Sequence, residues 1–102
     1  MSNNKDQQNQ IQIELTDEIA QGTYSNLAII SHSSSEFIVD FVRIVPGVPK
    51  AKVKSRIILT PEHAKRLLFA LNDNVVKFEQ QNGAINIENN PAPFFPPVGG
   101  EA

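Results

Sequence analysis

The chain has 102 residues, 40% of them hydrophobic, and a formal net charge of −2, which is the composition of one ordinary soluble domain. It contains no cysteine, so a disulfide framework, a thiolate metal site, a cysteine nucleophile and an iron–sulfur cluster are excluded. No segment has the apolar length of a secretory signal or a membrane span, and we therefore expect a cytoplasmic protein with no membrane association.

Both ends of the chain are predicted to lie outside the folded domain. Residues 1–10 are rich in Asn and Gln and have no apolar side chain after Met1, which is typical of a disordered arm. Residues 89–102 carry four prolines and a glycine pair and are predicted to form a Pro-rich tail. The remaining residues, 11–88, are predicted to fold as a single small domain, a size that favours self-association.

Four strands are predicted in the first half of this domain. Residues 11–15 alternate apolar and polar side chains, which is the pattern of a half-buried strand. Residues 23–32 and 36–45 are two β-rich runs joined by a short serine-rich link, and they predict an antiparallel hairpin. The prolines in residues 46–49 end the third strand, and residues 50–59 then form the fourth.

A long helix is predicted over residues 61–82. Thr60 can cap its first turn, Pro61 suits the first helical position, and Gly83 can end it as a left-handed residue. Apolar side chains recur at spacings of three and four and form one stripe: Ala64, Leu67, Leu68, Leu71, Val75 and Phe78. The predicted fold is therefore α+β: an antiparallel sheet of about four strands followed by one long C-terminal helix, in the order β-β-β-β-α.

The middle strands are apolar on both faces. On the third strand Phe37, Val39 and Phe41 point one way, while Ile38 and Val42 point the other. One helix can cover only one face of a sheet, so something else must cover the second. Either the N-terminal strand or the C-terminal tail folds back over it, or a second copy of the chain does, and the second reading predicts a homo-oligomer, with a dimer favoured.

A basic strand is the strongest charged feature. Lys50, Lys52, Lys54 and Arg56 occupy every second position, so that a regular strand would align four cations on one face. Such a face is a candidate anion or nucleic-acid surface, because neutralising phosphates needs clustered cations. Lysines also protect an edge strand from pairing with another chain, and this second interpretation stays open beside the first.

Few residues have the pattern of a chemical site. His32 and His63 are the only histidines, and neither has the spacing of a metal-ligand motif. The serines beside His32 are ordinary turn residues, and no glycine run could cradle a phosphate. We therefore assign no catalytic, cofactor-binding or metal-binding residue and expect no cofactor. Asp40 lies in an apolar strand and needs a partner if it is buried, for which Arg56 or Lys54 is the candidate.

The tail contains a candidate docking segment. Phe94 and Phe95 lie between prolines, which extend the backbone in advance and reduce the entropy lost on binding. Two adjacent rings suit a hydrophobic groove, either on a neighbouring protomer or on another protein.

Three stretches together carry a resemblance to a known family. They are residues 24–33, with a Tyr-Ser-Asn strand start, residues 36–41, with a Glu-Phe-x-x-Asp-Phe strand, and residues 49–68, with an Arg-Ile-Ile-Leu-Thr-Pro-x-His-Ala-Lys-Arg-Leu-Leu helix entry. In these stretches the chain resembles a family of short bacterial proteins known only as a domain of unknown function. The resemblance spans about residues 24–82 and implies a compact sheet-and-helix module, with no catalytic residue, cofactor or substrate attached to it.

These observations favour a non-enzymatic, self-associating binding or adaptor module. A protein partner fits this interpretation. The alternative is a nucleic-acid-associated protein that uses the basic strand of residues 50–56.

Overall fold

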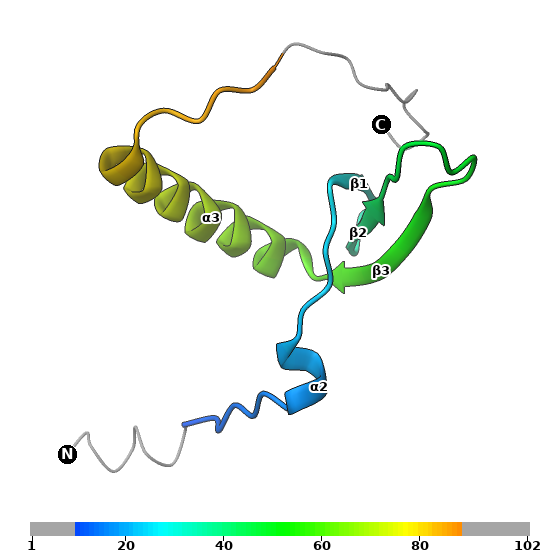
Figure 1. The fold of residues 1–102 in the computed structure, drawn as a ribbon. Coiled ribbons are helices and arrows are strands. Elements are labelled where there is room, and N and C mark those ends of the chain that lie inside the picture. The colour runs from blue at the N-terminus through cyan, green and yellow to red at the C-terminus, as the bar shows by residue number, and fades with distance from the viewer. Residues whose placement is uncertain (1–9, 89–102) are drawn as a thin grey trace, which may run out of the picture.

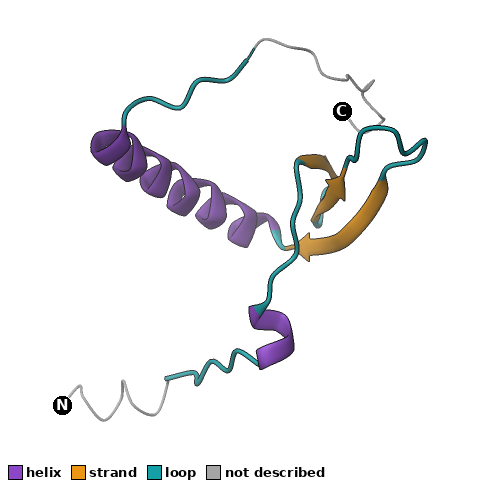
Figure 2. Cartoon of the chain, viewed as in Figure 1, coloured by secondary structure: helices purple, strands orange, loops and turns teal. Residues whose placement is uncertain are grey.

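The computed structural model describes residues 10–88, which form a small antiparallel sheet and one long helix (Figures 1 and 2). The elements are α2 (Asp17–Ala20), β1 (Leu27–His32), β2 (Phe37–Arg43), β3 (Lys52–Leu59) and α3 (Pro61–Asn82). The sheet has the strand order β1-β2-β3, so β2 is central and β1 and β3 are its edges. The α+β class is confirmed. The predicted terminal segments, residues 1–9 of the arm and the whole tail, lie outside the described residues.

The hairpin between β1 and β2 forms as predicted. The strands pair antiparallel, from Leu27 opposite Val42 to His32 opposite Phe37. Ser33 closes the link between them: its N–H donates to the Glu36 carbonyl over 2.9 Å, and its hydroxyl accepts from the Glu36 N–H over 3.3 Å. At the other end of the hairpin, the Asn26 side chain bridges to the backbone of Ile44 through two hydrogen bonds.

The pairing of β2 with β3 contains a β-bulge. Asp40 lies opposite Arg56 and Phe41 opposite Ser55, but Val42 lies opposite Val53, so that Lys54 is the extra residue. A bulge shifts the alternation of the strand by one residue. Two side chains separated by an even number of positions therefore lie on different faces of the sheet when the bulge is between them. This shift separates Arg56 from the lysines that precede it.

Helix α3 begins and ends where the local signals predict. The Thr60 hydroxyl accepts from the His63 N–H over 3.1 Å and caps the first turn, and Pro61 is the first helical residue. Gly83 ends the helix at φ +94° and ψ 166°. Its φ is positive as predicted, but its ψ lies outside the left-handed helical region, in a conformation that is essentially restricted to glycine.

The predicted first strand is wrong. Residues 11–15 are extended but belong to no sheet, and the described sheet has three strands instead of about four. Ile11, Ile13 and Leu15 are 82%, 90% and 67% exposed. The chain then forms the short helix α2, capped by the Thr16 hydroxyl, between the first two predicted strands, where no element was predicted. In Figure 1 this N-terminal segment projects away from the sheet.

Very little of the described chain is fully buried. Val39 and Val42, on opposite faces of the central strand, are the only described residues that reach full burial, at 8% and 3% exposure. Helix α3 leaves the end of β3 and extends past the sheet instead of lying along it (Figure 1). The single chain therefore leaves most of its apolar side chains in contact with water.

Candidate functional site

An apolar groove lies between the sheet and the first half of α3. It has a volume of about 570 Å³ and is lined by Ile30, Phe37, Val39, Leu59, Pro61, Ala64, Lys65, Leu67, Leu68 and Leu71. Lys65 is the only polar side chain in this lining. A groove of this size and chemistry recognises apolar surface and offers little to orient a polar ligand.

The strands place one set of side chains into this groove. Ile30 lies opposite Val39 across β1 and β2, and Phe37 lies opposite Leu59 across β2 and β3. Residues directly opposite each other share a face of the sheet, so this face turns toward the helix. The alternation of the sequence indicates the apolar side chains of β2, but it does not show that Ile30 and Leu59 lie on the same face.

Helix α3 has an apolar face that is wider than its contact with the sheet. Its leucines at 67, 68 and 71 line the groove yet remain 44%, 61% and 58% exposed. Beyond the groove, the same face continues with Val75, which is half-buried, and Phe78, which is 50% exposed. The predicted stripe is confirmed in its position on the helix, but most of it is left uncovered.

Two ion pairs mark the opposite face of α3. Glu62 pairs with Arg66, and Asp73 pairs with Lys77 over 3.2 Å, each at a spacing of four residues. All four side chains are more than half exposed, as expected for surface pairs that contribute little to stability. The helix is therefore amphipathic: one face is solvated, and the sheet covers the apolar face only in part.

Asp40 and Arg56 form an ion pair across β2 and β3. The Arg56 Nε donates to Asp40 Oδ1 over 2.7 Å, and Nη2 donates to Oδ2 over 2.9 Å. This bidentate contact confirms one of the two partners predicted for Asp40, whose side chain is only 14% exposed. The hydrogen bonds from Arg56, followed by its charge, hold the pKa of the Asp40 carboxyl below its usual value, although burial acts in the opposite direction.

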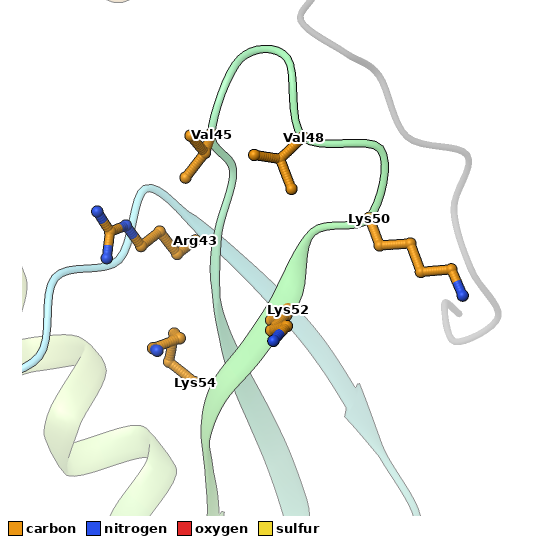
Figure 3. A pocket seen from close by; sticks show the side chains of 6 residues that line it. All are labelled: Arg43, Val45, Val48, Lys50, Lys52 and Lys54. Carbon is orange, nitrogen blue, oxygen red and sulfur yellow. The ribbon is translucent and has the colours of Figure 1, made fainter.

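The basic cluster differs from the predicted one. A hollow of about 140 Å³ at the β2–β3 turn is lined by Arg43, Val45, Val48, Lys50, Lys52 and Lys54. Arg43 lies opposite Lys52 and was not among the predicted residues. Figure 3 shows the Arg43 and Lys54 side chains on the same side of the turn, whereas that of Lys50 extends away from them.

Arg56 does not join this cluster. It lies opposite Asp40 and bonds to it, while Lys52 lies opposite Arg43, and Asp40 and Arg43 point to opposite faces of β2. The interpretation of four aligned cations is therefore wrong for Arg56, because it assumed a regular strand. The bulge at Lys54 gives no signal in the alternation of the sequence.

The two histidines, which the sequence analysis assigned to no site, lie on different elements. The His32 ring stacks on Phe37 with centroids 5.3 Å apart, and His63 lies exposed in the first turn of α3. Among residues 10–88, no group of three His, Asp or Glu side chains could hold a metal ion. No helix in the same range is long and apolar enough to cross a membrane. Phe94 and Phe95 lie outside the described residues.

The fold and groove define a small α+β module with an open apolar surface. A family profile described as "Protein of unknown function (DUF3467)" matches residues 1–87, and the chain belongs to that family. The membership confirms the resemblance read from the sequence. No curated protein and no solved structure matches the chain.

Proposed function

We propose that this protein is a self-associating binding module, and that two copies form a homodimer by covering each other's apolar groove. The observation that carries the proposal is the groove itself, about 570 Å³ in volume and almost wholly apolar, in a chain with two fully buried residues in its described part. Apolar surface exposed on this scale marks an interaction site in a protein that folds stably.

A second copy suits the groove because each chain carries both halves of the contact. The distal part of α3, with Val75 and Phe78 three residues apart on one side of the helix, lies beyond its own sheet and offers an apolar helix face. An amphipathic helix that lays its apolar face into a groove is a common recognition mode. When both copies do this reciprocally, the contact is closed and two-fold symmetric.

The test is light scattering coupled to size-exclusion chromatography at micromolar concentration. We expect a mass of twice the 11.3 kDa of one chain. The variant L68D places a charge in the groove and should shift the mass toward that of a monomer. The matched control A70D places the same charge on the exposed, solvated side of the helix and should leave the dimer intact.

Two results would contradict this proposal. One is a monomer for the unmodified chain with a cooperative thermal transition, which would show that the groove needs no second copy. The other is equal loss of dimer in L68D and A70D, which would trace the effect to helix propensity instead of the groove.

The proposed role is binding and not catalysis, and we place it in the cytoplasm. The apolar lining of the groove supports a binding role. A further protein partner would bind the surface that the dimer leaves uncovered. Fractionation of cells that produce a tagged chain tests the location.

A second candidate function is recognition of a polyanion, and the cluster at the β-bulge is the observation that favours it. Arg43, Lys52 and Lys54 gather there at one hollow. We rank this function second, because Asp40 engages Arg56 and the whole chain is net acidic. Binding to nucleic acid that is salt-sensitive, submillimolar or tighter, and lost when K52E and K54E are combined, would reverse this ranking. The control pair R66E and K77E, on the exposed face of α3, should leave such binding unchanged.

A further inference from the structure

We propose that residues 11–15 form an exchanged strand that pairs, in a second copy of the chain, with the edge of β3 that no strand among residues 10–88 occupies. This inference rests on the proposed homodimer and specifies how part of it is built. The fourth strand that the sequence indicates would then exist, but between two chains instead of within one.

The segment has the properties of a strand without a sheet. Its backbone makes no hydrogen bond to any other part of the chain that the structure describes. Its apolar residues all occupy alternate positions and are at least 67% exposed. An isolated extended segment gains nothing from this alternation, whereas a strand added to a sheet buries one face and satisfies its N–H and C=O groups.

The chain directs this segment away from its own sheet. Thr16 caps α2 directly after it, and Gly22, at φ +81°, turns the chain directly after that helix. In Figure 1 residues 10–16 lie on the far side of α2 from β3. A second copy can reach the segment in this position, which is the geometry of an exchanged arm.

The edge of β3 is the one that matches the segment in both apolar pattern and charge. On β3, Ile57 and Ile58 are 42% and 56% exposed, and three cations lie on the same strand. Lysines on an edge oppose pairing with an arbitrary strand, but the segment carries Glu14 and is followed by two further acids. The edge of β1 offers no Lys or Arg and one strongly exposed large apolar side chain, Ile30.

An antiparallel register satisfies these constraints together. With Ile13 opposite Ile57, Glu14 falls opposite Arg56, whose guanidinium bonds to Asp40 but whose side chain stays 60% exposed on the outer side. Ile11 then meets Leu59 at the mouth of the groove. The exchanged strand would thus extend the apolar face that the proposed homodimer covers.

Disulfide trapping tests the pairing without background, because the chain has no cysteine of its own. Residues directly opposite on neighbouring strands have Cα atoms about 4.5–5.5 Å apart, within the range that a disulfide bridges. We expect a mixture of I13C chains and I57C chains to form a covalent dimer that contains one of each, identified by its mass. I13C mixed with I30C, on the edge of β1, should form little.

A second measurement tests the pairing even if the two cysteines lie in a geometry that does not allow a disulfide. Ile13 is 90% exposed in the single chain, so I13D should be neutral unless another chain buries this side chain. We expect I13D to weaken dimerisation by about tenfold or more, as the loss of one buried isoleucine implies. Q12D carries the same charge on the other face of the strand and should change dimerisation much less.

The outcomes separate this inference from the proposed function. A dimer that persists in I13D, with no I13C–I57C product, overturns the exchanged strand and leaves the groove-mediated dimer standing. An internal disulfide in the double variant I13C/I57C shows pairing within one chain and also overturns it. If I13C chains form the covalent dimer with I30C chains instead, the segment pairs with the edge of β1, and the pairing with β3 is overturned.

Discussion

At the scale of single residues, the contact between Asp40 and Arg56 shows how a charged residue is accommodated in an apolar strand. A carboxylate that is 14% exposed would be costly without a partner, and Arg56 supplies two hydrogen bonds to it. The pair also fixes the register of β2 and β3, because a slip by one residue would separate the two charges.

This pair predicts a defined pH dependence. Arg56 lowers the pKa of Asp40 below 3.8, and a lowered pKa contributes stability that is present above the ordinary value and is lost as the pH falls through the lowered one. We expect R56A to melt at a lower temperature than the unmodified chain at pH 5–7. The difference should begin to shrink below about pH 4, where the carboxyl of the unfolded chain takes up a proton, and should disappear as the pH falls through the lowered pKa of folded Asp40.

Thermal melts at a series of pH values, at one protein concentration, measure this difference. R66A is the control, since it removes an exposed helical ion pair that contributes less than about 0.5 kcal/mol. A melting difference for R56A that stays constant down to pH 2.5 would show that the arginine acts through packing and not through the carboxylate.

At the scale of elements, local sequence signals predict the bounds of the helix correctly, but they do not predict how the strands of the sheet pair. Thr60, Pro61 and Gly83 act on the backbone next to them, and the helix therefore begins and ends as the sequence predicts. The alternation in residues 11–15 correctly indicates an extended segment, but periodicity does not say which strand will pair with it. The bulge at Lys54 is set by pairing across the sheet, so the cation pattern alone misplaced Arg56.

The cap of α3 provides a prediction at this scale. The Thr60 hydroxyl satisfies the His63 N–H, and its removal leaves that donor to water. We expect T60A to lower the free energy of unfolding by about 1 kcal/mol, and T60S to retain most of it. Urea denaturation at fixed protein concentration measures both variants. Equal loss in T60A and T60S would indicate that the threonine methyl group matters, and not the hydroxyl.

At the scale of the whole molecule, the open groove and the unpaired segment have the same physical cause. The described part of the chain has two fully buried residues, a small core to set against its conformational entropy, and the homodimer we propose would supply further burial. When a second copy supplies this burial, folding and association become one equilibrium.

This coupling predicts a melting temperature that depends on protein concentration. For a dimer that dissociates as it unfolds, each tenfold rise in concentration adds about 1.4 kcal/mol to the stability of the folded form. Divided by the unfolding entropy of two small domains, this corresponds to a rise of roughly 5 °C. Calorimetry or circular dichroism over two decades of concentration measures the shift. The groove variant L68D should melt lower than A70D at every concentration, and a midpoint that does not move with concentration in the unmodified chain would mean that one copy folds alone.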